Sequence, residues 1–179
     1  VTALADRHTT VLADRLIHHS LLMGVQTSGA QLKRFAHNDL ADLERKLDQV
    51  RSARASKPLL VISASLFSME GTSPNLEELT SICQHHGARL LVDEAHALGV
   101  LGPGGRGLAA SVANTDTPSG RTITMVSGTF GKAFGSGGAF LATDAAWGDT
   151  LLQTSGAFRY TTALAPPLAA GALAALELI

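Results

Sequence analysis

The sequence has one cysteine, few aromatic residues and no excess of charge of either sign. Cys83 is the single cysteine among 179 residues, so no disulfide can form within the chain. Its neighbours have a helical pattern, which favours a packed thiol over a reactive one, and we expect a reducing, cytoplasmic setting. Because 45% of the residues are hydrophobic, a packed core must hold the fold together.

Charge and hydropathy limit the partners that this chain can have. Its 14 Lys and Arg residues are balanced by 15 Asp and Glu residues, which gives a formal net charge of −1. Such a chain has no basic field to hold a nucleic-acid backbone. No apolar run reaches the roughly 18 residues of a membrane span, and the first residues do not resemble a signal peptide. A small molecule is therefore the expected partner, with no nucleic acid and no membrane.

Short apolar runs alternate with helical patterns, which is typical of a parallel sheet with crossover helices. We expect strands at residues 9–13, 32–36, 59–63, 89–93, 121–126 and 137–143, and helices at 17–25, 40–53, 74–86, 147–154 and from Pro166 onward. Unbroken apolarity places the strand at 59–63 in the centre of the sheet. The predicted fold class is α/β, a three-layer α/β/α arrangement around a mostly parallel sheet.

Two of these helices have capping residues at their starts. Asn38 or Asp39 is placed to cap the helix at 40–53. Ser73, followed by Pro74 and two acids, predicts a helix that begins at Pro74 and ends before Gly87.

Residues with reactive or ionisable side chains follow several of the predicted strands. Ser68, Asp93, His96 and Lys132 all come after strands whose carboxyl ends share one edge of an α/β sheet, where ligands bind. A pyridoxal cofactor needs an amine for an imine, an acid against its ring nitrogen and a donor for its phenolic oxygen. Lys132, Asp93 and His96 supply these groups. We therefore expect one pocket to contain these three residues and Ser68.

Six segments in order resemble the α-oxoamine synthases, a family of fold-type-I pyridoxal-phosphate enzymes with the aminotransferase class I/II fold. They are residues 13–20, 34–39, 67–71, 92–96 with the glycine-rich stretch 99–107, 129–132, and 160–162 before Pro166. The resemblance covers nearly the whole sequence. It implies a transferase with pyridoxal 5'-phosphate as cofactor.

The resemblance also implies roles for individual residues. Lys132 would be the Schiff-base lysine, Asp93 would pair with the pyridine nitrogen, and His96 and Ser68 would flank the phenolic oxygen. His18, favoured over His19 by the family pattern, would stack on the cofactor ring. Thr129 would bind the phosphate, and Thr161 and Thr162 would help to bind it across the subunit interface of a homodimer.

The implied reaction joins a small amino acid to an acyl-CoA with loss of carbon dioxide. L-alanine and pimeloyl-CoA are the expected substrates, and Lys132 would also remove the Cα proton. Relatives that use glycine or serine, of the 5-aminolevulinate synthase, 2-amino-3-ketobutyrate CoA ligase and serine palmitoyltransferase types, remain alternatives. A noncatalytic subunit that keeps the fold is another. The sequence departs from the family at Ala64, where an acid is usual, and at residues 70–72, where Asp-Gly-Asp is usual.

The ends of the sequence predict a piece of a longer protein. It begins at Val1, and it ends in an apolar helical pattern at 173–179 that has no cap. We expect residues 1–165 to be a cofactor-binding large domain, incomplete at its N-terminus. Residues 166–179 would begin the helix that leads to a missing C-terminal domain, and without the missing parts the fragment would be inactive.

Some of these residues also occur in patterns of two other functions, a helicase and a metal site. Asp93, Glu94 and His96 belong to a motif of one class of RNA helicases, but those proteins need Gly-x-x-x-x-Gly-Lys-Ser/Thr, and Lys132 is followed by Ala133. The histidine pairs 18–19 and 85–86 lack the i, i+4 spacing of helical metal ligands. Neither a helicase nor a metal site is predicted.

Overall fold

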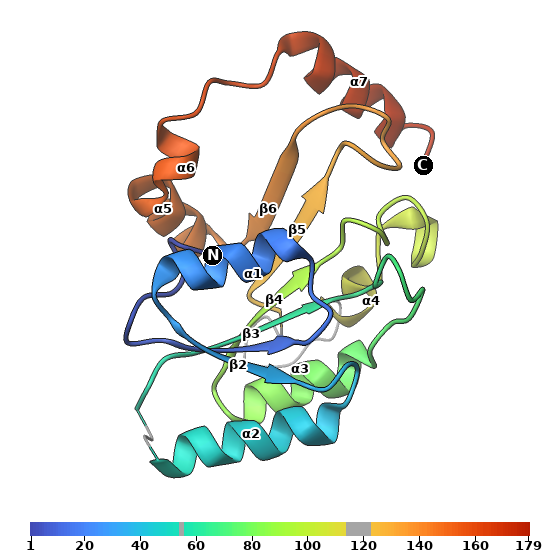
Figure 1. Ribbon diagram of the computed structural model, residues 1–179. Helices are drawn as coiled ribbons and strands as arrows, with labels where there is room; N and C mark the ends of the chain where they lie inside the picture. Colours follow the sequence, from blue (N-terminus) through green and yellow to red (C-terminus); the bar gives the residue numbers. More distant parts are fainter. Residues whose placement is uncertain (54–55, 114–122) are drawn as a thin grey trace.

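The computed structural model describes residues 1–53, 56–113 and 123–179, and in them six strands form one sheet (Figure 1). The strands are β1 (Thr10–Asp14), β2 (Gln31–Phe35), β3 (Leu59–Ala64), β4 (Arg89–Asp93), β5 (Met125–Thr129) and β6 (Ala139–Thr143). Their order is β2-β1-β3-β4-β5-β6, and only β6 runs antiparallel to its neighbour. β3 is an inner strand that is buried along its whole length, as predicted.

Helices cover both faces of this sheet. On one face α2 (Leu40–Ala53), α3 (Leu76–His85) and the short α4 (Ala109–Ala113) pack over Leu12 and Val61. On the other face α1 (His19–Ser28) and α5 (Ala145–Thr154) pack over Val11 and Leu60. Successive residues of a strand point to opposite faces, so each strand contributes to both hydrophobic clusters. The predicted three-layer α/β/α class is confirmed.

Side chains at the helix starts fix where the chain turns helical. Asp39 accepts a hydrogen bond from the Asp42 N–H at 2.9 Å, so Asp39 provides the cap that was predicted for α2. The prediction that Ser73 caps a helix beginning at Pro74 is wrong. Asn75 caps α3 instead, because its side chain accepts from the Glu78 N–H at 3.2 Å. α1 ends at Ser28, and the following Gly29 adopts the left-handed conformation that glycine takes at helix ends.

The strand predicted at 121–126 differs from the strand that forms. Residues 121–122 lie outside the described part of the chain, and β5 begins at Met125 and continues to Thr129. The antiparallel ladder with β6 runs as far as Thr129 opposite Ala139, which extends β5 past the predicted end. The short elements η1 (Pro103–Gly105), α4 and α6 (Gly156–Arg159) were not predicted, because runs of three to five residues have little periodicity of their own.

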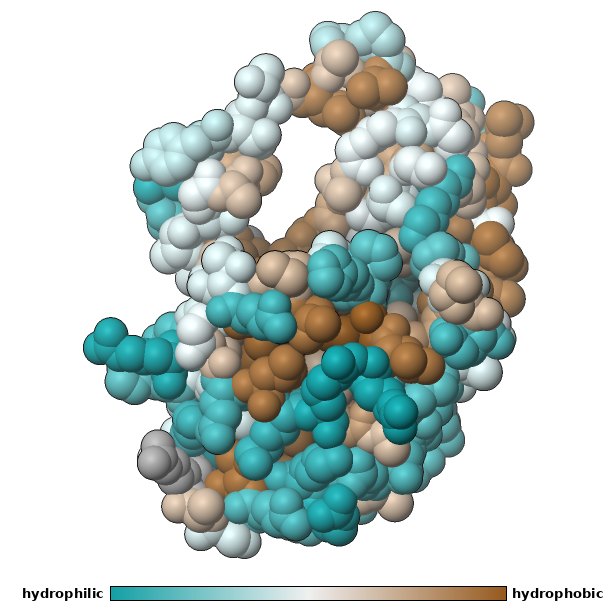
Figure 2. Space-filling view, viewed as in Figure 1, coloured by the Kyte–Doolittle hydropathy of each residue, from teal (hydrophilic) through white to brown (hydrophobic). Residues whose placement is uncertain are grey.

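The last helix, α7 (Pro166–Leu176), begins at the predicted proline. It is apolar, yet Leu168, Leu173 and Leu176 are exposed and only Ala172 is buried. Figure 2 shows brown and pale residues over α7 at the top of the view, whereas teal residues gather over α2 at the bottom. None of the helices in the described ranges is both long enough and apolar enough to cross a membrane.

Candidate active site

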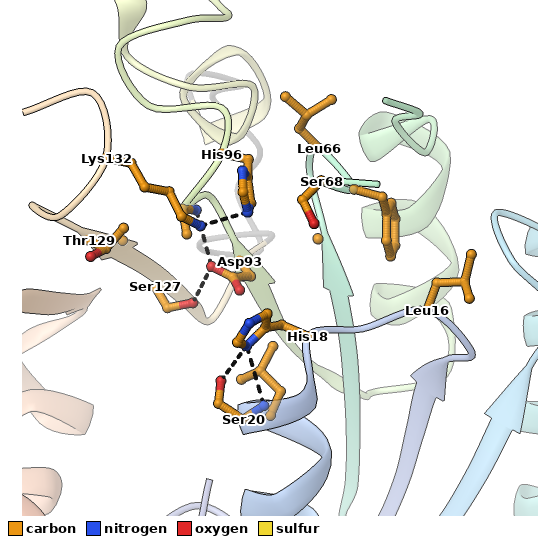
Figure 3. A pocket seen from close by; sticks show the side chains of 15 residues that line it. Leu16, His18, Ser20, Leu66, Ser68, Asp93, His96, Ser127, Thr129 and Lys132 are labelled. Carbon is orange, nitrogen blue, oxygen red and sulfur yellow. Dashed lines mark hydrogen bonds between the residues drawn. The ribbon is translucent and has the colours of Figure 1, made fainter. Parts of the chain in front are cut away.

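A pocket of about 420 Å³ lies at the edge of the sheet where the parallel strands end (Figure 3). Its walls come from the loops that follow β1, β3, β4 and β5, together with the first turn of α1. Small-molecule sites occupy roughly 300–1,000 Å³ and lie at this edge in open α/β sheets. His18, Ser68, Asp93, His96, Thr129 and Lys132 all line the pocket. The expectation that one pocket contains Ser68, Asp93, His96 and Lys132 therefore agrees with the structure.

Lys132 and His96 contact each other in this pocket. The Lys132 Nζ lies 2.6 Å from the His96 Nε2, although the two residues come from different loops (Figure 3). Burial lowers the pKa of both side chains, and the positive charge of Lys132 lowers the pKa of His96 further. The Asp93 carboxylate acts in the opposite direction and raises both pKa values. An amine with a lowered pKa is the nucleophile that imine formation requires.

Asp93 ends β4 and is half-buried. Its Oδ1 accepts hydrogen bonds from the Ala95 N–H at 3.1 Å and from the Ser127 hydroxyl at 3.2 Å. These two donors orient the carboxylate in the pocket, where it could accept a hydrogen bond from a cationic ring nitrogen. Ser127 was missed by sequence reasoning. The available signal was its place directly after the strand predicted at 121–126; in the structure it lies within β5, paired in register with Asp93.

His18, and not His19, lines the pocket. The His18 side chain caps α1, since its Nδ1 accepts a hydrogen bond from the Ser20 N–H at 3.3 Å and lies 2.8 Å from the Ser20 hydroxyl. Ser68 lies in the loop after β3 (Figure 3). The Thr129 hydroxyl accepts from the Gly131 N–H at 3.1 Å and donates to the Gly138 carbonyl at 3.2 Å, which orders the loop that carries Lys132.

Thr161 and Thr162 do not line this pocket. They are exposed in the connection between α6 and α7 (Figure 1). Their predicted role across a subunit interface is untested, because it concerns the pocket of a second subunit.

Both departures from the family pattern lie at or beside the pocket. Ala64 is buried in the pocket wall, and its Cα is paired in register with that of Asp93. Thr72 contacts His37 behind the wall that carries Ser68, at 2.7 Å between its hydroxyl and the ring Nε2.

Glu94 is a buried acid next to Asp93 that does not line the pocket. Its structural role was not predicted from the sequence. Its carboxylate accepts hydrogen bonds from the Leu108 N–H at 3.2 Å and the Ala109 N–H at 2.6 Å. Gly107 packs so closely that an added Cβ would lie 2.2 Å from the Glu94 Oε2. Glu94 thus fixes the glycine-rich stretch that follows His96, and only a glycine fits at position 107.

A family model described as aminotransferase class I and II matches residues 1–179. The chain belongs to this family. At the sequence level it is 43% identical over 177 residues to the 8-amino-7-oxononanoate synthase of Chromohalobacter salexigens. That match covers 99% of the chain and 44% of the relative, so the chain spans less than half the length of this curated relative.

Solved structures give the same family. A serine palmitoyltransferase from S. paucimobilis with a bound PLP–myriocin aldimine superimposes with a TM-score of 0.87 at 29% identity, over 98% of this chain and 42% of that one. The 8-amino-7-oxononanoate synthase of Francisella tularensis has a TM-score of 0.77 at 31% identity, over 99% of this chain and 48% of that one. Both enzymes are α-oxoamine synthases, so the resemblance read from the motifs is confirmed.

Proposed function

We propose that this chain is the cofactor-binding core of a pyridoxal-phosphate-dependent α-oxoamine synthase of the 8-amino-7-oxononanoate synthase type. The observation that carries the proposal is the 2.6 Å contact between the Lys132 amine and the His96 imidazole in a pocket that also contains the Asp93 carboxylate. The names of the similar enzymes and the pyridoxal phosphate bound to one of them support it.

The side chains present fit the demands of this cofactor. When bound, pyridoxal phosphate supplies an aldehyde that condenses with amines and a ring that accepts electrons from the substrate Cα. The Lys132 amine would hold the cofactor through its aldehyde carbon, and the Asp93 carboxylate would accept a hydrogen bond from the protonated ring nitrogen. His96 and Ser68 would donate to the phenolic oxygen, His18 would cover one face of the ring, and Thr129 would contact the phosphate.

The same residues would move the protons of the reaction. The lowered pKa of Lys132 increases the fraction of the amine that is unprotonated, and an unprotonated Nζ can accept the proton from the substrate Cα. His96 lies close enough to Nζ to pass protons to it or take them from it. Asp93 keeps the ring nitrogen protonated. We propose L-alanine and pimeloyl-CoA as substrates, with release of carbon dioxide and CoA, in biotin biosynthesis.

The rest of the architecture follows from this proposal. Residues 1–165 would be the large domain, and α7 would begin the connection to a further domain, because its apolar side chains at 168, 173 and 176 are exposed. The intact protein would be a homodimer in which Thr161 and Thr162 reach the phosphate of the partner subunit.

A test of the cofactor site compares Lys132→Ala with Lys57→Ala in the intact protein that carries this chain. Lys57 binds Gln31 at the opposite edge of the sheet and serves as the matched control. With pyridoxal phosphate, the unmodified protein and Lys57→Ala are expected to gain a near-visible absorbance band that borohydride bleaches. Lys132→Ala should lack it and should lose about 10²- to 10⁴-fold in turnover, the usual contribution of a positioned base. An unchanged band in Lys132→Ala would refute the proposal.

Serine palmitoyltransferase activity is the second candidate, because a solved enzyme of that name has the higher of the two TM-scores. The two are separated by assaying CoA release with alanine, glycine or serine against pimeloyl-CoA and palmitoyl-CoA. Alanine with pimeloyl-CoA is the expected pair. Cofactor binding without CoA release from any pair would favour a noncatalytic subunit.

A further inference from the structure

His37 lies behind the pocket and joins two of its walls, although it does not line the pocket. Its Nδ1 is 3.0 Å from the Asp14 Oδ1, and its Nε2 is 2.7 Å from the Thr72 hydroxyl. Asp14 ends β1, and Thr72 lies in the loop that follows β3. The imidazole therefore connects the end of β1 to the loop that follows the neighbouring strand β3, through side chains that are 58 positions apart, at 14 and 72.

Asp14 is a fully buried carboxylate that organises the loop after β1. Besides the His37 ring, it accepts the Leu16 N–H and the Asn38 N–H, each at 2.8 Å. Leu16 lines the pocket, and His18 follows two residues later. Leu16 and His18 form one wall of the pocket, called here the His18 wall. The position of this wall thus depends on the Asp14 carboxylate, which also binds His37.

Thr72 closes the loop that carries Ser68. The Phe67 N–H donates to the Thr72 carbonyl at 2.9 Å, and the Gly71 N–H donates to the Phe67 carbonyl at the same distance. The buried Phe67 ring packs edge-on against the His37 ring, with centroids 4.5 Å apart. Phe67 and Ser68 both line the pocket. These two residues form a second wall, called here the Ser68 wall, and moving His37 would shift it as well.

The hydrogen-bonding roles along this chain of residues are set by Asp14. An ionised carboxylate only accepts, so the His37 Nδ1 must carry a proton. The Thr72 hydroxyl can donate to the ring Nε2 or accept from it, and it keeps its bond in either case. A valine at position 72 would have nearly the same shape and neither ability.

We propose that Asp14, His37 and Thr72 form a positioning relay that fixes the His18 wall and the Ser68 wall of the pocket relative to each other. The inference rests on the proposed function for its effect on cofactor binding, but its structural content does not. Thr72 and His37 are positioning residues because they act through Leu16, Phe67 and Ser68.

The test uses Thr72→Val and Thr72→Ser in the intact protein, with Thr150→Val as a matched control. Thr150 is exposed on α5, and its hydroxyl bonds only the Ala146 carbonyl of its own helix among the contacts described. The first measurement is hydrogen–deuterium exchange of amides 14–20 and 66–72 without cofactor. Thr72→Val should speed exchange in both segments, while Thr72→Ser and Thr150→Val should leave both unchanged. Faster exchange confined to residues 66–72 would overturn the relay.

The second measurement is the dissociation constant of pyridoxal phosphate, read from the near-visible absorbance. Thr72→Val should raise it about 3- to 10-fold, equivalent to the loss of one hydrogen bond, and Thr72→Ser should restore it. Equal weakening in both variants would overturn the role of the hydroxyl. If the unmodified protein binds no cofactor, the proposed function fails, while the exchange experiment still decides the relay.

Discussion

Two opposite effects, burial and the charge of Asp93, act on the pKa of Lys132. Burial favours the uncharged amine and lowers the pKa of Lys132 from 10.5, whereas the Asp93 carboxylate favours the ammonium and raises that pKa. The net direction is downward, so burial dominates. Both effects arise in the pocket and depend on residues that come from different loops.

This balance predicts a shift in the pH dependence of imine formation when Asp93 loses its charge. In Asp93→Asn the ammonium of Lys132 loses a stabilising negative charge, so the pKa of Lys132 should fall further. The rate of imine formation with pyridoxal phosphate should then reach its plateau at a lower pH than in the unmodified protein. Stopped-flow absorbance across pH measures this rate. A midpoint that moves to higher pH would contradict the argument.

The elements around the pocket are held in place by a few buried polar side chains. Glu94 ties the end of β4 to the start of α4 through two backbone N–H groups. Burial raises the pKa of Glu94 above its ordinary 4.5, and the two N–H donors oppose that rise. The helix pattern of α2, with Leu43 and Leu47 buried, was sufficient to give its bounds, but no pattern predicted α4.

Replacing Glu94 with Ala tests its structural role. The change leaves two backbone donors without their acceptor, so unfolding free energy should fall by about 2–4 kcal/mol. Glu44→Ala, an exposed site on α2, should change it by less than about 0.5 kcal/mol. Chemical denaturation of the intact protein measures both.

The loss of unfolding free energy caused by Glu94→Ala should depend on pH, and the raised pKa of Glu94 sets the direction. A carboxyl group with a raised folded pKa stabilises the fold most below its ordinary pKa, and this stabilisation is lost as pH rises through the folded value. The unfolding free energy of the unmodified protein should therefore exceed that of Glu94→Ala by less at neutral pH than at pH 4. A difference that grows over this range would contradict the raised pKa.

At the scale of the whole molecule, two hydrophobic clusters sandwich the sheet. Cys83 belongs to the cluster beneath α2 and α3 and is completely buried. Burial raises the pKa of its thiol to about 12, so little of the reactive thiolate exists in the folded protein. Access to Cys83 therefore requires the α2–α3 layer to separate from the sheet.

We expect thiol labelling at Cys83 to follow unfolding. In native buffer an alkylating reagent should modify Cys83 far more slowly than it modifies a free thiol. The extent of labelling should rise with denaturant along the global unfolding curve, measured by mass spectrometry of the peptide that contains Cys83. Rapid labelling without denaturant would show that this layer opens locally.

The sequence by itself determined the alternation of strands and helices, the central place of β3 and the residue types that the pocket needs. These depend on local periodicity and on which residues directly follow a strand. The motif pattern also favoured His18 over His19, and His18 is the one that lines the pocket.

Only the tertiary structure decided which of those residues touch. The sheet places β1 between β2 and β3, which differs from the order of the strands along the chain, and it pairs β4 with β5. Lys132 reaches His96 across 36 positions, Ser127 supports Asp93, and His37 joins Asp14 to Thr72 through these neighbour relations. Contacts between loops depend on which strands lie side by side, and side-chain periodicity along one strand contains no information about its neighbours.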